Sequence, residues 1–257
     1  MTGDPSLDMD RFRELINIAM EFGDVVAISA QVPMSGMSHA ITIKVPLRVR
    51  MMEEGKGFKR YLTTGTPVDG VKLAFHTLLG RRPDLLLSGI NHGSNSSSSI
   101  LYSGTMGAAM EGAINHVPSM GLSLLDYRAD ADFEASAGIA GELIRMVLEK
   151  GLPDGICLNV NIPSIPAAEI RGIKFCNQAN GYWKEEFEKR TDPNGHEYYW
   201  LTGFFHNREP KGGGTGTDEW ALANHYVSVV PINTDMTAYP VLEKLKDWET
   251  SGIRNEA

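Results

Sequence analysis

Apolar and polar positions follow two different periods along this chain, and the periods predict where its helices and strands lie. Over residues 10–22, Phe12, Leu15, Ile16 and Ala19 recur at helical spacing before Gly23 ends the pattern. Further helices are predicted over residues 68–79, 105–115 and 129–150. Short apolar runs between them predict strands over residues 25–29, 85–87, 120–125 and 156–162. Strands that alternate with helices predict a mostly parallel sheet covered on both faces.

Strands are also predicted in two regions where no helix lies between them. Residues 41–49 alternate, and a glycine-rich turn at residues 55–57 leads to residues 61–63, which predicts a β-hairpin. After Pro163, strands are predicted over residues 173–176, 198–202 and 226–231, and residues 205–217 form a glycine-rich flexible stretch. We therefore expect an α/β fold. It has a Rossmann-like three-layer core over residues 1–165 and a β-rich extension over residues 166–257, which packs back on the core and joins subunits.

The amino-acid composition limits which binding partners and which cellular compartment we expect for this protein. The chain has 257 residues, 42% of them hydrophobic, which is enough for a sizeable core. Its formal net charge of −8 offers no basic field for a nucleic acid polymer. No apolar run approaches the ~20 residues of a membrane helix, and no signal core precedes the first helix. Cys157 and Cys176 are expected as core thiols, so we expect a cytoplasmic protein without a membrane partner.

Residues 84–112 are the most informative polar segment. An apolar run ends in a loop rich in asparagine and serine, and a helix of small residues starts near Thr105. Ligands of open α/β sheets bind at the carboxyl ends of the strands, and helix N-termini attract anions through their N–H groups and dipole. Four residues are placed to bind phosphate: Asn95, Ser103, Gly104 and Thr105. The alternative is that they only cap a helix after a solvent loop.

The amino-acid sequences of this segment and of several others resemble those of the SurE family (survival protein E) of metal-dependent 5′/3′-nucleotidases. The matching segments, in chain order, are SGMSHAIT at residues 35–42, GTPVD at 65–69, SGINHGSN at 88–95, YSGTMGAAMEG at 102–112, LNVNIP at 158–163, and DPNG at 192–195 followed by GTD at 216–218. Any one of them is weak evidence, but in this order over about residues 12–240 they are specific.

The resemblance implies an activity and a set of site residues. It implies hydrolysis of nucleoside monophosphates to nucleoside and phosphate with one divalent metal ion, Mg or Mn or similar. Asp4, Ser35 and Asn91 would hold the metal, with Asp4 and Asn91 as the catalytic residues. Asn95, Ser103, Gly104, Thr105 and His39 would bind the substrate, although His39 is as readily a structural histidine. Family members are commonly homo-oligomers, so a homodimer or homotetramer is expected.

The N-terminus departs from the family pattern. Family members open with a strand that ends in N-D-D-G, whereas Gly3-Asp4-Pro5-Ser6 stands there and keeps only the first aspartate. Met1 and Thr2 cannot supply the ~5 residues of a strand, so a slot is expected in the sheet. Asp8 and Asp10 are nearby substitutes, but acids before a helix more often cap it. The alternative function is therefore a catalytically weak or inactive SurE-like scaffold, or a phosphate-binding oligomer.

Three further polar residues have structural interpretations, and several enzyme classes lack support. Asp69 is expected to cap its helix, Asp218 to fix a turn, and His92 to face solvent. The sequence contains no GxSxG, Walker or HExxH motif, so it gives no support to serine-hydrolase, P-loop or zinc-hydrolase chemistry.

Overall fold

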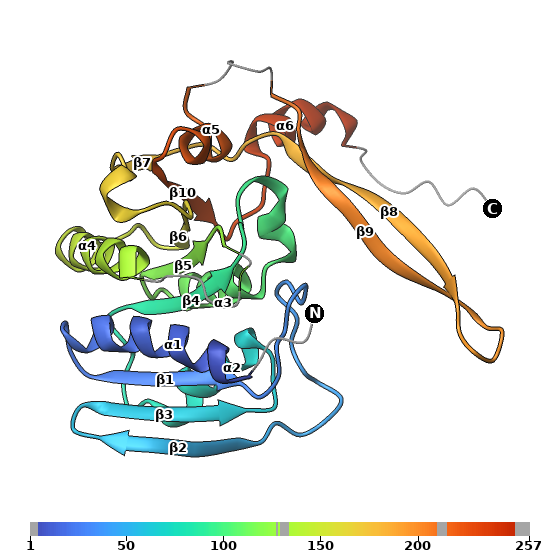
Figure 1. Cartoon of the computed structure of the whole chain (residues 1–257). Coiled ribbons are helices and arrows are strands. Elements are labelled where there is room, and N and C mark those ends of the chain that lie inside the picture. The colour runs from blue at the N-terminus through green and yellow to red at the C-terminus, as the bar shows by residue number, and fades with distance from the viewer. Residues whose placement is uncertain (1–4, 127, 129–133, 210–214, 250–257) are drawn as a thin grey trace, which may run out of the picture.

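The structure is a computed structural model that describes residues 5–126, 128, 134–209 and 215–249 (Figure 1). Its helices are α1 (Pro5–Met20), α2 (Pro67–Leu73), α3 (Gly104–Ile114), α4 (Glu134–Lys150), α5 (Asp218–Ala223) and α6 (Tyr239–Leu245). Shorter helical turns are η1 (Ala74–Leu78), η2 (Ser97–Tyr102), η3 (Ala167–Glu169) and η4 (Lys246–Trp248). The strands are β1 (Val25–Ala30), β2 (Val49–Gly55), β3 (Phe58–Thr63), β4 (Leu86–His92), β5 (Ser119–Leu124), β6 (Ile156–Ile162), β7 (Ile173–Phe175), β8 (Gly181–Thr191), β9 (Glu197–Asn207) and β10 (Val227–Asn233).

The strands form a mostly parallel α/β arrangement, which confirms the expected fold class. A five-stranded sheet has the order β4-β5-β6-β10-β7, with β4, β5 and β6 parallel and β10 antiparallel to β6. A three-stranded sheet has the order β1-β3-β2, with β1 parallel to β3. Helices α1 and α4 pack together on one side, and α3 packs on β4, β5 and β6 from the other, so helices cover both faces. The main core joins Leu143 and Ile144 of α4 to Met120, Leu122 and Val160 of the sheet.

Among the described residues, no strand pairs with the edge of β1 and the edge of β4 that face each other. Each of these strands hydrogen-bonds to one neighbour only, β3 and β5 respectively. Helix α1 contacts both strands, and α2, which covers β1, packs on α3, which covers β4, so the two sheets share their helical layers. Only Ala27 of β1 and Ile90 of β4 are buried, whereas every residue of β5 is. No strand of the described part of the chain occupies this position, and the slot that the sequence led us to expect stays a prediction, because residues 1–4 lie outside the described residues.

The first helix begins earlier than the sequence pattern indicated. Leu15 and Ile16 are buried as predicted, but α1 starts at Pro5 rather than at residue 10. Pro5 and Ser6, which align with the N-D-D-G segment of the family, therefore lie in the first turn of a helix. A proline fits that turn because its missing N–H would have no helical partner there.

The predicted β-hairpin before α2 is present, but its first strand lies later in the sequence than predicted. Strands β2 and β3 pair antiparallel across a turn at Gly57, which has a φ of 70°, but residues 41–48 form no strand. The backbone N–H of Thr42 donates to the Asp69 side chain and that of Arg48 to Thr64 Oγ1, so side chains take the donors that a strand ladder needs.

The second half of the chain contributes both to the sheet and to a projecting hairpin. Strands β7 and β10 extend the five-stranded sheet, and α5 packs on β10. Strands β8 and β9 pair only with each other and project from the body (Figure 1). The predicted strand at 198–202 lies in the first half of β9, whereas β8 was not predicted because its run of charged residues hides the strand pattern. The boundary at residue 165 stays a prediction.

Candidate active site

A cavity of about 1030 Å³ lies at the carboxyl ends of β1 and β4. It is lined by six of the residues that the sequence singled out: Ser35, Asn91, Asn95, Ser103, Gly104 and Thr105. The structure therefore brings the loop after β1 to the polar loop and the start of α3, which follow β4 much later in the sequence. His39 is not among the lining residues, and Asp4 lies outside the described residues.

Asn91 lies near the end of β4, where its side chain is held by the following turn. Its Nδ2 donates to the carbonyl oxygens of His92 and Gly93, at 3.1 and 3.0 Å. These bonds orient the amide so that Oδ1 points away from both carbonyl groups. Asn91 therefore lines the cavity with its amide held in place, and its Oδ1 is left as a neutral acceptor.

The loop after Asn91 is fixed by a buried network of amides. Asn95 is only 4% exposed, its N–H donates to Asn161 Oδ1 at 2.7 Å, and its Nδ2 donates to Ser123 Oγ at 2.7 Å. Asn159 Nδ2 donates to the carbonyl oxygen of Asn95 at 2.8 Å, and Asn161 Nδ2 donates to Asn159 Oδ1. Polar side chains of β5 and β6 thus hold the loop, which accounts for the two asparagines of the LNVNIP segment.

Helix α3 starts at the cavity wall. Ser103 caps it, with Oγ accepting from the N–H of Met106 at 3.1 Å, as the capping interpretation predicted. The first N–H groups of a helix lack partners within the helix and lie at the positive end of its dipole. Since Gly104 and Thr105 line the cavity, their N–H groups suit an anion there. Among the described Asp, Glu, Lys and Arg residues, Arg60 and Glu185 also line it.

The described residues meet the needs of a divalent metal only in part. Ser35 and Asn91 supply neutral oxygens, but Mg and Mn usually take at least one or two carboxylates. No cluster of three or more His, Cys, Asp or Glu residues suited to a metal occurs in the part of the chain that the structure describes. Asp8 and Asp10 both lie within α1. Glu185 is the one carboxylate among the described residues that line the cavity, so a site with two carboxylates needs a second one from elsewhere in the chain.

The remaining polar candidates have structural partners. Asp69 forms a capping box with Thr66, as predicted. Asp218 is fully buried and accepts from the N–H groups of Ser97 and Ala179, so it fixes two loops rather than one turn. His92 is half-buried and donates from Nδ1 to the carbonyl oxygen of Asp126 at 2.7 Å, so the expectation that it faces solvent was wrong.

Two aromatic residues at the cavity were missed by the sequence analysis. Tyr102 and Trp183 both line it, and Trp183 Nε1 donates to Ser99 Oγ at 3.0 Å. The only sequence signal for Trp183 is an aromatic pair, Tyr182-Trp183, at the start of a strand that the sequence did not reveal. Its position at the cavity depends on the register between β8 and β9 and on the contact of β8 with η2.

The fold and the cavity together define an α/β protein with a polar-lined cavity at the carboxyl ends of its parallel strands. The family model described as "Survival protein SurE" matches residues 1–185. The chain is 48% identical to "5'-nucleotidase SurE" of Christiangramia forsetii over 250 residues, which is 96% of this chain and 95% of that protein. It is 49% identical to the protein of the same name from Cytophaga hutchinsonii over 239 residues, 92% of this chain and 91% of that protein. The chain therefore belongs to the SurE family.

A solved structure agrees with this assignment. The crystal structure of the SurE protein from Aquifex aeolicus superimposes with a TM-score of 0.77 at 36% sequence identity, covering 93% of this chain and 94% of that one. The family resemblance found in the sequence is thus confirmed by relatives that span nearly the whole chain.

Proposed function

We propose that this chain is a phosphoric monoester hydrolase that converts nucleoside monophosphates to nucleoside and inorganic phosphate. Its relatives carry the name 5'-nucleotidase SurE, which favours the 5′-monophosphate and favours the enzyme over an inactive scaffold. The observation that carries the proposal is one cavity that joins Ser35, Asn91 and the N-terminus of α3.

The phosphate group would lie against the start of α3. There the N–H groups of Gly104 and Thr105 and the hydroxyl hydrogens of Ser103 and Thr105 can donate to its oxygens. Asn95 would help indirectly, because its bonds to Ser123 and Asn161 hold the loop that forms the adjoining wall. Donors that are fixed before the substrate arrives stabilise developing charge without reorganising, which is the usual source of rate enhancement in such sites.

One divalent ion, Mg or Mn, is part of this proposal. Ser35 and Asn91 would supply neutral oxygens, and Asp4 is the carboxylate that the sequence places nearest. A bound divalent ion offsets phosphoryl charge and lowers the pKa of attacking water. With a single carboxylate such an ion is held weakly, so we expect low turnover from the chain as it stands.

The nucleoside would extend toward Tyr102 and Trp183. The indole of Trp183 is held at Nε1 by Ser99, and its ring meets Phe205 edge to face with centroids 6.2 Å apart. An aromatic ring fixed in this way offers a stacking face to any base, and base stacking contributes ~1–3 kcal/mol. Stacking of this kind does not discriminate strongly between bases, so we expect activity on several nucleotides.

A second copy of this chain is the proposed partner. The β8–β9 hairpin exposes large apolar side chains, among them Phe187, Trp200 and Phe204, at 65%, 56% and 50%. Apolar surface of this extent usually lies in an interface, so a homodimer or homotetramer is proposed. Among the described residues no helix is long and apolar enough to span a membrane. We propose a cytoplasmic location, which fits two buried cysteines that form no disulfide.

Phosphate release from nucleoside 5′- and 3′-monophosphates, with Mg, Mn or Co added and with EDTA, tests the function. We expect metal-dependent release that is abolished by Asn91→Ala and by EDTA. Release that survives both changes would place the activity elsewhere.

A further inference from the structure

The segment that brings Ser35 to the cavity has no helix or strand of its own. It runs over residues 31–48 between β1 and β2. Irregular segments of this length inside compact domains are uncommon and are usually functional. Because no ladder holds this one, its shape must come from contacts with neighbouring elements. Residues 31 and 48 bond to the end of β3 and the residue after it, and the contacts between them include a group at residues 38–42.

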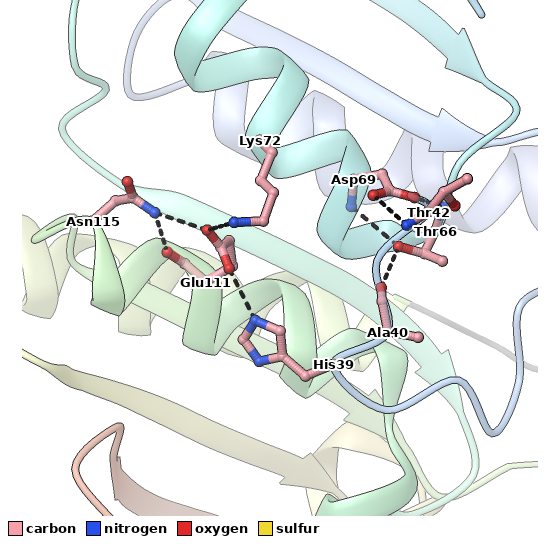
Figure 2. A network of polar contacts seen from close by, with 8 residues as sticks. All are labelled: His39, Ala40, Thr42, Thr66, Asp69, Lys72, Glu111 and Asn115. Atoms are coloured by element: carbon pink, nitrogen blue, oxygen red, sulfur yellow. Dashed lines mark hydrogen bonds and ion pairs between the residues drawn. The ribbon is translucent and has the colours of Figure 1, made fainter. Parts of the chain in front are cut away.

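A buried carboxylate of α3 binds the segment directly (Figure 2). The side chain of Glu111 is 5% exposed, and its Oε2 lies 2.9 Å from Nε2 of His39. Its Oε1 accepts from Lys72 Nζ at 2.7 Å and from Asn115 Nδ2 at 3.0 Å. Burial raises the pKa of Glu111, but the bonds from Lys72 and His39 outweigh burial and leave the pKa below its ordinary value. The group therefore binds His39 as a carboxylate.

The backbone of the segment lies directly on α3, one turn before Glu111. A Cβ at Gly107 would overlap the carbonyl oxygen of Ser38 and lie 3.1 Å from the Cα of His39. Ser38 is also bound to η2. Its N–H donates to the carbonyl oxygen of Tyr102 at 3.1 Å, and its Oγ donates to that of Leu101 at 2.7 Å. The glycine at residue 107 is thus explained by the close approach of the segment.

A second buried carboxylate holds the other end of the same stretch. Asp69 of α2 accepts from the N–H of Thr42 at 3.0 Å, and Thr66 Oγ1 donates to the carbonyl oxygen of Ala40 at 2.7 Å (Figure 2). Two acids on neighbouring helices therefore bind residues 38–42 from both ends. Neither Glu111 nor Asp69 lines the cavity.

We propose that Glu111 is a positioning residue for the hydrolysis: through His39 it holds the segment that brings Ser35 to the cavity that Asn91 also lines. The proposal rests on the proposed function for its kinetic consequences. It assigns His39 an indirect role, in place of the direct contact with substrate that the sequence suggested. A displacement of ~1 Å in a site of this kind can lower the rate ~100-fold.

Kinetics of Glu111→Gln, with Glu169→Gln as the matched control, test the proposal. The amide keeps the shape of Glu111 but not its charge, so His39 is held less firmly. We expect kcat to fall at least ~10-fold with KM within ~2-fold, since Glu111 does not touch the substrate. Glu169→Gln makes the same change at an exposed position in η3, away from this network, and should leave kcat within ~2-fold. Unchanged kcat in a folded Glu111→Gln variant would overturn the proposal.

A pair of variants at His39 separates positioning from chemistry. The side-chain amide of His39→Gln can still donate to Glu111, whereas His39→Leu cannot. We expect His39→Gln to retain most of the kcat that His39→Leu loses. If the folded glutamine variant is as impaired as the leucine variant, the imidazole itself acts on the substrate and the proposal is wrong.

Amide hydrogen exchange gives a readout that does not depend on activity. In Glu111→Gln, peptides covering residues 35–42 should exchange at least ~10-fold faster than in the parent chain, with no change in β5 or β6. Unchanged exchange would overturn the proposal. If no phosphomonoester is hydrolysed by any version, the proposed function fails, whereas exchange still decides whether Glu111 holds this segment.

Discussion

Asp218 of α5 accepts a hydrogen bond at 2.8 Å from the backbone N–H of Ser97, in the polar loop that follows β4. The same carboxylate accepts from the N–H of Ala179 at 2.9 Å, just before the β8–β9 hairpin. A fully buried side chain from the second half of the chain thus fixes both a loop beside the cavity and the base of the hairpin. The site is therefore not a property of the first half alone.

Replacing Asp218 by asparagine should destabilise the fold. The amide group would turn a donor toward the N–H groups of Ser97 or Ala179, and an unsatisfied buried donor costs ~1–3 kcal/mol. Urea unfolding followed by circular dichroism measures this change. Asp247→Asn, at an exposed position in η4, is the control and should stay within ~0.5 kcal/mol of the parent. Equal stability of the two variants would contradict the role assigned to Asp218.

The stability contributed by Glu111 should depend on pH. Its pKa lies below the ordinary value of 4.5, so in the folded state it binds a proton less readily than in the unfolded state. Such a carboxyl stabilises the fold above the unfolded pKa, and this contribution is lost as the pH falls through the folded pKa. The Tm difference between the parent and Glu111→Gln should be largest at neutral pH and shrink below about 4.5. Calorimetry that finds the same difference at pH 7 and pH 3.5 would contradict it.

Trp183 should matter for nucleotides and not for phosphate esters that lack a base. Loss of ~1–3 kcal/mol of stacking in Trp183→Ala should raise KM for a nucleoside monophosphate ~5-fold or more. For p-nitrophenyl phosphate, KM should stay within ~2-fold. Trp248→Ala, at a position that is 77% exposed in η4, is the control. Equal effects of Trp183→Ala on both substrates would show that the indole supports the cavity without binding the base.

The projecting hairpin should hold an oligomer together. Light scattering at micromolar concentration should show at least a dimer for the parent chain. Phe187→Glu combined with Trp200→Glu should shift it toward the monomer, because a buried unpaired charge opposes association. Glu186→Lys, an exposed charge change on the same strand, should have no such effect. A monomeric parent would reject the hairpin as an interface.

The sequence predicted those parts of the fold whose signal is local. Leu15 and Ile16 gave the first helix, and the apolar runs at residues 120–125 and 156–162 gave strands that the structure confirms as β5 and β6. The irregular course of residues 41–48 could not be predicted, because it depends on Asp69 taking the N–H of Thr42 across 27 positions. The position of Trp183 at the cavity could not be predicted either, because it depends on how β8 pairs with β9. The contact between His39 and Glu111 joins residues that are distant in sequence, so it forms only when α3 packs against the segment.

One comparison of turnover rates tests the central claim, that the cavity at β1, β4 and α3 hydrolyses nucleoside monophosphates once a divalent ion is held by enough carboxylates. Phosphate release from a nucleoside 5′-monophosphate is measured at saturating Mn or Mg. Three versions are compared: the chain as it stands, one with a strand ending in N-D-D-G in place of residues 3–6, and a matched one ending in N-A-A-G. Asn91→Ala is then added to the N-D-D-G version.

The N-D-D-G version should reach ordinary enzyme rates of ~1–10³ per second. The added strand would fill the open edges of β1 and β4, and the paired carboxylates would hold the ion that offsets charge in the transition state. The chain as it stands should turn over measurably but more slowly, and the N-A-A-G version and the Asn91→Ala version should be inactive. Ordinary rates from the unaltered chain would show that another acid completes the site. The assignment of the cavity would be contradicted by an N-D-D-G version that folds but stays inactive. It would also be contradicted if the N-D-D-G version kept its rate after Asn91→Ala.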